Sequence, residues 1–372
     1  MTKLTWRQVI AWRLHNHNLL ERAPKGSLLD VATALGGLHA QVMSSAELIA
    51  WARVEGLAPE DVRKALWEER TLVKTWAMRG TLHLLPAREF PTYVAALRTR
   101  HGYRRASWLK YFNMTLEDMD AIIEGVRVAL DGRNLTREQL SEAVGEATGS
   151  ADVRERLRSG WGEFLKPAAS NGYLCFGPNM GQAVTFVRPD QWLGTWYDSD
   201  SDEAIREVLR RYLTTYGPAT RDDFARWFGW EPKYARSLFL GMAGELVEVD
   251  VEGWKAMTLA SIIDEQRTFE APAAGVRLLP AFDPYTIAYY PDSHYLDPDK
   301  KDRVYRKGAW ITPVVLVNGR IEGLWEQEKK SSGLTLKVEM FQPPSLEVQH
   351  GIEAETERLA TFLDTRVELG YR

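Results

Sequence analysis

The sequence is nearly free of cysteine, with Cys175 the single one among 372 residues. One cysteine excludes an internal disulfide and any zinc or iron–sulfur site built on several cysteines. Because Cys175 stands between Leu174 and Phe176, we expect a buried strand residue there. The seven histidines are dispersed, and His15 and His17 would lie on different faces of a helix, so no metal site is expected.

Long apolar runs are missing as well. No stretch approaches the about 18 consecutive apolar residues of a membrane-spanning helix. The N-terminus intersperses Arg7, Arg13 and His15 among apolar residues, unlike the continuous apolar core of a signal peptide. The sequence therefore predicts a cytoplasmic protein without a membrane partner.

Several motifs that carry enzyme chemistry are also absent. The sequence has no phosphate-binding loop of the Gly-x-x-x-x-Gly-Lys type, no Gly-x-Gly-x-x-Gly, no His-Glu-x-x-His and no Gly-x-Ser-x-Gly. Nucleotide-driven, dinucleotide-dependent, zinc-protease and common esterase chemistry are therefore not expected. We expect no cofactor.

The composition is that of a folded protein, with 45% hydrophobic, 11% aromatic and 26% charged residues. Its length suggests about two to four domains. Charge is unevenly distributed: residues 1–110 carry 17 Lys and Arg against 9 Asp and Glu, and the rest carries 30 against 42. Because charges act locally, the basic N-terminal part is where a polyanion would bind.

Three stretches share one order of elements, which is a capped helix, a second helix and two short strands joined by a turn. This order is typical of a winged helix. In the first stretch we predict a helix from Ser27 through Ala34, helices over 46–54 and 60–67, and strands over 72–78 and 81–85 around an Arg79-Gly80 turn. In the second we predict helices over 137–146 and 162–170, and strands over 173–176 and 184–187 around a Gly-Pro-Asn turn. In the third we predict helices over 221–228 and 233–242, and strands over 246–250 and 254–258.

A short internal repeat supports this reading. The segments Leu-Thr-Arg-Glu-Gln-Leu (135–140) and Ala-Thr-Arg-Asp-Asp-Phe (219–224) align residue for residue, about one module apart. In each, the threonine is placed to cap the helix that follows.

After residue 275 the sequence becomes rich in strand-forming residues. Strands are predicted over 276–282, 314–317 and 334–341, with a hairpin at Asn318-Gly319 and a closing amphipathic helix over 352–368. The fold class is therefore α+β. We expect a first winged-helix module with a basic helical extension (1–133), a second (134–198), a third (199–270) and a β-rich C-terminal element (271–372).

The stretch from residue 90 to residue 116 contains no acidic residue. It interleaves basic and aromatic side chains, namely Arg98, Arg100, Arg104, Arg105 and Lys110 with Tyr93, Tyr103, Trp108, Tyr111 and Phe112. Cations neutralise phosphates and aromatic rings stack on bases, so the pattern is typical of a nucleic-acid surface. The alternative is a solvated helix whose aromatic residues face the core. Arg79 at the tip of the first wing is either another DNA contact or a plain turn residue.

The segment Gly36-Gly37-Leu38-His39-Ala40-Gln41 follows the first predicted helix. Two glycines free the backbone, and His39 and Gln41 would lie on the same side of an extended segment. The pair either contacts a ligand or satisfies backbone groups at the helix end.

The sequence resembles the winged-helix DNA glycosylases of the AlkZ/YcaQ type over most of its length. The matching segments are Leu38-His39-Ala40-Gln41, residues 76–84, residues 174–177 with 185–188, residues 278–283, and Val317-Asn-Gly-Arg320 with Gly323. The family's catalytic motif is Gln, an aliphatic residue and Gln, and here it falls on His39, Ala40 and Gln41. The sequence thus keeps the second Gln and has His in place of the first.

The resemblance implies three tandem winged-helix modules and a β element that form a concave DNA channel. It implies hydrolysis of the N-glycosidic bond of bulky N7-alkylated purines, in some members with unhooking of interstrand cross-links. His39 and Gln41 would be catalytic, Arg320 joins the basic residues above as a DNA-contact candidate, and a monomer that acts on double-stranded DNA is expected.

Two rival functions are open. A winged-helix regulator would read base edges with the helix over 60–67, but its acidic residues Glu60, Asp61, Glu68 and Glu69 make a poor major-groove reader. A module that binds other proteins is consistent with the acidic balance after residue 110. We favour a monofunctional DNA glycosylase.

Overall fold

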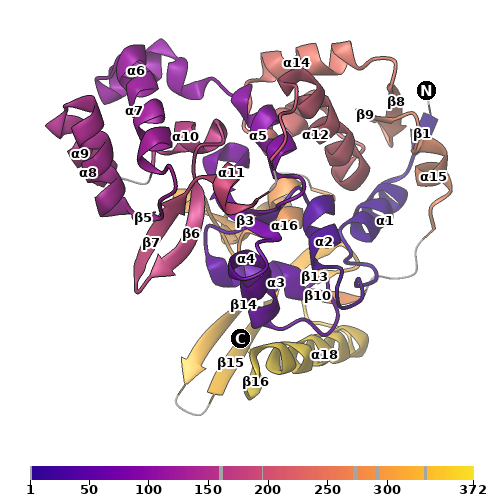
Figure 1. Ribbon diagram of the computed structural model, residues 1–372. Helices are drawn as coiled ribbons and strands as arrows, with labels where there is room; N and C mark the ends of the chain where they lie inside the picture. The colour runs from indigo at the N-terminus through magenta and orange to yellow at the C-terminus, as the bar shows by residue number, and fades with distance from the viewer. Residues whose placement is uncertain (1, 159–161, 195, 271–274, 290–292, 331–332) are drawn as a thin grey trace. The chain divides into compact units, whose positions relative to one another are not determined.

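The computed structural model describes residues 2–158, 162–194, 196–270, 275–289, 293–330 and 333–372 of a mixed α/β chain (Figure 1). The chain divides into two compact units. Unit 1 comprises Met1–Arg63, Arg210–Trp227 and Glu231–Arg372, and unit 2 comprises Lys64–Leu209 and Phe228–Trp230. Three helices contain points at which the chain passes between the units, namely α4 (Pro59–Trp67), α12 (Ser201–Tyr216) and α13 (Arg221–Phe228). Among the described residues, no helix combines the length and apolarity needed to cross a membrane.

Unit 1 contains a five-stranded sheet in the order β10 (Val276–Leu279), β13 (Val314–Val317), β14 (Arg320–Lys330), β15 (Gly333–Met340) and β16 (Val367–Tyr371). The hairpin predicted at Asn318-Gly319 is confirmed, because Val317 pairs with Arg320 across it. All pairs are antiparallel except β15 with β16, which is parallel.

The closing helix is α18 (Leu346–Leu363), and the predicted range of 352–368 was wrong at both ends. The side chain of Ser345 accepts a hydrogen bond from the Val348 amide at its start, and Asp364 ends it in a left-handed conformation. The residues that follow form β16. The strand signal in the sequence is the alternation of apolar Val367 and Leu369 with polar Glu368, and in the structure the first two are half-buried and Glu368 is exposed.

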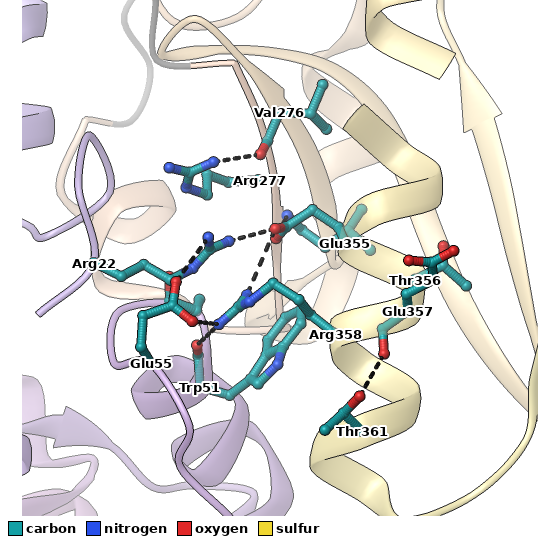
Figure 2. Close-up of polar contacts among 12 residues, drawn as sticks. Arg22, Trp51, Glu55, Val276, Arg277, Glu355, Thr356, Glu357, Arg358 and Thr361 are labelled. Atoms are coloured by element: carbon teal, nitrogen blue, oxygen red, sulfur yellow. Dashed lines mark hydrogen bonds and ion pairs between the residues drawn. The ribbon is translucent and has the colours of Figure 1, made fainter. Parts of the chain in front are cut away.

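An ion-pair network joins α18 to the N-terminal part of unit 1 (Figure 2). The side chain of Glu355 is 4% exposed and pairs with both Arg22 and Arg358. Glu55 pairs with the same two arginines, at 3.5 and 3.6 Å. Glu355 also accepts a hydrogen bond from the backbone N–H of Leu278 in β10 at 3.3 Å. The network therefore ties the last long helix to the sheet and to the start of the chain.

The third predicted stretch supplies a smaller sheet in unit 1. Its order is β1 (Thr2–Leu4), β8 (Leu246–Val251) and β9 (Trp254–Leu259), with β1 parallel to β8. The remaining elements of unit 1 are α1 (Trp6–Asn16), α2 (Leu28–Ala34), β2 (Leu38–His39), α3 (Met43–Trp51), α14 (Pro232–Gly241), α15 (Ile263–Thr268), α16 (Pro284–Ala288), α17 (Lys301–Val304), β11 (Tyr305–Arg306) and β12 (Trp310–Ile311), with 3-10 turns at Pro298–Lys300 and Lys307–Ala309.

Several details of the first stretch differ from the prediction, and one is that the strand predicted over 72–78 ends at Trp76. Ser27 precedes α2 but its side chain makes no capping hydrogen bond. The helix predicted over 46–54 is α3, which begins and ends three residues earlier. It ends early because Val54 leaves the helix to form a β-bridge with Ala23, in which Ala23 donates to Arg53 and Glu55 donates to Ala23.

Unit 2 contains the hairpin of β3 (Leu72–Trp76) and β4 (Leu82–Pro86) and the sheet β5 (Leu135–Thr136), β7 (Ala183–Val187) and β6 (Cys175–Met180). Its remaining elements are α5 (Phe90–Arg98), α6 (Ala106–Phe112), α7 (Leu116–Ala129), α8 (Arg137–Thr148), α9 (Ala151–Arg158), α10 (Lys166–Ser170) and α11 (Pro189–Trp192), with 3-10 turns at Met78–Gly80 and Gly102–Arg104. Cys175 is buried in a strand, as predicted.

The turn predicted at Gly-Pro-Asn in this unit was wrong. Strand β6 continues through those residues to Met180, and the chain reverses at Gly181-Gln182. An irregularity in register between Gly177 and Met180 accommodates Pro178, whose carbonyl accepts from the Thr185 hydroxyl at 2.8 Å. A proline therefore did not end the strand. Helix α10 also begins four residues later than predicted, and α9 was not predicted.

The internal repeat is confirmed at the level of local structure. Thr136 and Gln139 exchange hydrogen bonds at the start of α8, at 2.9 and 3.3 Å. Thr220 and Asp223 make the same exchange at the start of α13, at 2.9 and 3.2 Å. Both are capping boxes, so the two segments use one device to begin a helix.

Candidate active site

The His39–Gln41 segment is preceded by a helix end whose backbone conformation only glycine adopts easily. Gly36 and Gly37 both have positive φ, at 68° and 102°. The N–H of Gly37 donates to the carbonyl of Ala32 at 2.7 Å, which closes the end of α2. The chain thereby reverses sharply and enters β2. The conformational freedom predicted for the two glycines is thus used.

Side chains of α12 hold this helix end in unit 1. The Thr215 hydroxyl donates to the carbonyl of Ala34 at 2.7 Å, and the Tyr216 hydroxyl donates to the carbonyl of Leu35 at 2.7 Å. Both donors are buried. Because they donate to the last carbonyls of α2, the end of this helix is held in place, and so is the start of the segment that follows it.

The two candidate catalytic residues lie in different environments. His39 is 3% exposed, whereas Gln41 is exposed, and the fully buried Ala40 separates them. The His39 ring stacks on the ring of Phe282, with centroids 5.1 Å apart and planes 22° apart. Helix α3 begins two residues after Gln41. A buried imidazole thus precedes an amide that faces solvent.

Phe282 lies beside a buried ion pair. Arg53 and Asp283 are both fully buried, and two hydrogen bonds of 2.7 and 2.8 Å join the guanidinium to the carboxylate. Asp283 also accepts from the Tyr285 amide at 2.9 Å and so caps α16. Sequence reasoning noted residues 278–283 only as a matching segment, and it gave no signal for Arg53.

A cavity of about 680 Å³ lies next to the segment in unit 1. Its walls include Val42, Ser44 and Ser45 at the start of α3, and Arg306 and Trp310 from β11 and β12. Trp310 is 44% exposed, and its ring meets the Phe282 ring edge-on, with centroids 4.9 Å apart. The His39–Phe282–Trp310 series of rings therefore leads from the buried imidazole to this cavity.

In the basic stretch of unit 2, some cationic side chains are hydrogen-bonded to backbone carbonyls and the others are exposed. Arg98 donates to the carbonyl of Asn171 at 3.2 Å, and Arg100 donates to the carbonyl of Ala77 at 2.8 Å. Burial lowers the pKa of Arg100 to about 10. These two arginines therefore have structural roles inside the unit, and contact of either with DNA stays a prediction.

The other cations of the stretch face solvent. Arg104 forms an ion pair with Asp120 at 2.8 Å, with side chains 44% and 52% exposed. Arg105 and Lys110 are also exposed. A surface pair such as Arg104–Asp120 is weak and can exchange its partner for a phosphate.

Most aromatic residues of the stretch serve the core, as the alternative interpretation held. Tyr93 is fully buried, and Trp108 and Phe112 both pack their rings against Phe164. Tyr111 is the exception, at 81% exposed. The pattern is therefore three short helical pieces with a packed face rather than one continuous aromatic surface.

The two remaining candidates lie in different units. Arg79 has a φ of 57° in the turn between β3 and β4 of unit 2 and is half-buried. Arg320 in unit 1 pairs with Glu322 at 3.3 Å and donates to the carbonyl of His294 at 2.5 Å. Within the described residues, no group of three His, Cys, Asp or Glu side chains is arranged to hold a metal ion.

The family model described as "DNA glycosylase AlkZ-like" matches residues 32–362. The chain belongs to the AlkZ-like DNA glycosylase family. A relative from Streptomyces sahachiroi, named "Interstrand DNA cross-link repair glycosylase", is 40% identical over 331 residues, which cover 87% of this chain and 88% of the relative. The solved structure of Streptomyces sahachiroi DNA glycosylase AlkZ superposes with a TM-score of 0.91 at 35% identity, over 100% of both chains. As an AlkZ-like glycosylase the protein is an enzyme whose substrate is DNA, and a non-enzymatic regulator is not favoured.

Proposed function

We propose that this AlkZ-like enzyme hydrolyses the N-glycosidic bond of N7-alkylated purines in double-stranded DNA, including bulky adducts and interstrand cross-links. This would be the first step of base excision repair. The observation that carries the proposal is that buried His39 and exposed Gln41 lie two residues apart on the segment that follows the anchored end of α2. The relative from Streptomyces sahachiroi, which is named as an interstrand DNA cross-link repair glycosylase, supports the cross-link as a substrate.

The chemistry of the lesion explains why a carboxylate is not required. Alkylation at N7 gives the purine a positive charge, so the base leaves with the bonding electron pair and becomes neutral without prior protonation. The enzyme then needs to position a water molecule and stabilise the oxocarbenium-like sugar. The water oxygen adds to C1′ of the sugar, and a water proton passes to a proton-accepting side chain.

We assign these two tasks to His39 and Gln41. The amide oxygen of Gln41 accepts a hydrogen bond from the attacking water and orients it. Neutral His39 accepts the proton, or holds Gln41 in place. Neither residue has an amine that could form a Schiff base with the sugar, so we infer a monofunctional hydrolase that leaves an intact abasic site.

DNA binding is assigned to the repeated units of helices and hairpins. We propose that residues 1–133, 134–198 and 199–270 are three tandem winged-helix modules, the first with a basic helical extension, and that they form a concave DNA channel together with the β-rich C-terminal element of residues 271–372. Among the basic candidates, Arg104, Arg105 and Lys110 suit phosphate contacts because they are exposed. Arg79 and Arg320 are assigned secondary contacts, and the active species is a monomer.

Base release from defined duplexes tests the function. Three substrates are compared, which carry a site-specific N7-methylguanine, a bulky N7-guanine adduct and an N7–N7 interstrand cross-link. Released base is identified by mass spectrometry, and the abasic product is detected as a strand break after mild alkali. We expect release of the free base from the first two duplexes, with breaks only after alkali. For the cross-link we expect the strands to separate in a denaturing gel, while the excised purine stays attached to the other strand until that strand is hydrolysed as well. Tight DNA binding without release from any of the three duplexes would overturn the proposal in favour of a DNA-binding regulator.

A further inference from the structure

We propose that Phe282 is a positioning residue for the glycosylase reaction, because its ring holds the imidazole of His39 in its working orientation. The proposal rests on the function assigned above to His39. It concerns a residue that would touch neither DNA nor the attacking water. Three observations support it, namely the stacked rings, the backbone conformation of Phe282 and the buried ion pair that fixes that conformation.

The ring contact is of a kind that fixes orientation. Rings of His39 and Phe282 lie 5.1 Å apart and only 22° from parallel, so the imidazole has a flat wall beside it. Such stacked arrangements are favoured over random contacts between rings. Trp310 meets the Phe282 ring edge-on at 77°, which limits rotation of the phenyl group in turn.

Phe282 occupies a backbone conformation that a bulky residue rarely adopts. Its φ is 61°, in the left-handed region that favours glycine. Such strain persists only where the surroundings over-determine it, and it concentrates at functional sites. The same turn is closed by the Asp283 amide, which donates to the carbonyl of Pro280 at 3.3 Å.

The ion pair of Asp283 with Arg53 holds the backbone of Phe282 in this left-handed conformation. Two hydrogen bonds join the fully buried groups, so the residue after Phe282 cannot move without breaking them. Arg53 itself donates to the carbonyl of Ile49 in the last turn of α3 at 3.0 Å. Helix α3 therefore has the catalytic segment before its first residue and the anchor of Phe282 after its last.

The test is a double-mutant cycle on the single-turnover rate of base release, using the full chain and a duplex with a site-specific N7-methylguanine. The variants are Phe282→Leu, His39→Ala and the double variant. Phe282→Tyr keeps the ring, and Phe362→Leu is a matched control because Phe362 is a phenylalanine of unit 1 that is 4% exposed and contacts Trp51 instead. DNA affinity and the fraction of active enzyme are measured for each.

We expect Phe282→Leu to lower the rate about 10- to 100-fold at unchanged DNA affinity and unchanged reaction amplitude. Phe282→Tyr should recover most of the rate, and Phe362→Leu should keep it. In the His39→Ala background, Phe282→Leu should have almost no further effect, since it acts through the imidazole.

Four results would count against the proposal. Additive effects of Phe282→Leu and His39→Ala would show that Phe282 acts elsewhere. A loss of amplitude alone would show that the ring only stabilises the fold. If wild-type enzyme released no base, the proposed function itself would fall and Phe282 would have no reaction to serve, whereas release by both wild type and Phe282→Leu at equal rates would reject only the positioning role.

Discussion

Replacing Arg53 by methionine is expected to destabilise the protein strongly. Methionine keeps the apolar length of the side chain but removes the guanidinium that faces Asp283. Both groups of the pair are 0% exposed, so the carboxylate would be left as a buried charge that still accepts a hydrogen bond from the Tyr285 amide at 2.9 Å. Breaking a buried pair in this way costs about 3–5 kcal/mol.

The free energy of unfolding is measured by urea titration followed by tryptophan fluorescence. Arg127→Met is the matched control, because Arg127 pairs with Glu124 through side chains that are 38% and 56% exposed, and such a surface pair contributes about 0–1 kcal/mol. The double variant Arg53→Met with Asp283→Asn should recover much of the loss, since it removes the unpaired charge and leaves an N-cap residue.

If Arg53→Met lost no more stability than Arg127→Met, the buried pair would not contribute as proposed. The same would follow from a double variant that is less stable than Arg53→Met by the full cost of losing Asp283. Either result would mean that the buried pair does not hold the turn in which Phe282 lies, and the structural basis of the inferred positioning would be lost with it.

Three further predictions concern the pH dependence, the thiol and the C-terminal helix. Burial, and then the charges of Arg53 and Arg13, lower the pKa of His17 well below 6.5. As the pH falls below 6.5, the unfolded chain therefore binds a proton that the native state does not, and the free energy of unfolding should fall by up to about 1.4 kcal/mol per pH unit more than in His17→Gln. Urea unfolding between pH 7 and 5.5 measures this difference. Burial also raises the pKa of Cys175, so a thiol-specific chromogenic reagent at pH 8 should leave the native protein unmodified and react once urea unfolds it; prompt reaction under native conditions would contradict this. In the network of Figure 2, Glu355→Gln should cost about 3 kcal/mol and Glu55→Gln under about 1 kcal/mol, because their side chains are 4% and 53% exposed; equal losses would contradict the account.

Local signals in the sequence predicted the parts of the fold that depend on neighbouring residues. The capping boxes at Thr136 and Thr220 and the Asn318-Gly319 hairpin lie where the sequence places them. Each requires only a few consecutive residues, so it depends little on distant partners, although the cap predicted from the same kind of signal at Ser27 does not form. The two glycines before His39 belong to the same class.

Features that depend on distant residues could not be predicted. Arg53 and Asp283 are 230 positions apart, and nothing near either residue announces its partner. Val54 leaves its helix for a bridge with Ala23, and Pro178 is tolerated in a strand because of a register irregularity. In these cases tertiary contacts outweighed local propensity.

The candidate site shows the same division. The resemblance identifies His39 and Gln41 as catalytic candidates from the sequence. That His39 is buried and Gln41 is exposed is a property of the folded chain. The charge pattern of the basic stretch allows either a nucleic-acid surface or a helix packed on the core, and in the structure Arg98 and Arg100 are held by backbone carbonyls of unit 2. Charge pattern alone does not separate a phosphate contact from a structural arginine.

Gln41 and His39 are proposed to hydrolyse the N-glycosidic bond of the damaged purine. This is tested most directly by the single-turnover rate of base release from a bulky N7-alkylguanine duplex. Gln41→Ala and His39→Ala are compared with wild type and with Gln342→Ala, a control at another exposed glutamine. We expect a rate loss of about 100-fold or more for Gln41→Ala and His39→Ala at unchanged DNA affinity, and no loss for Gln342→Ala. Full activity in Gln41→Ala, with wild type active, would contradict this assignment.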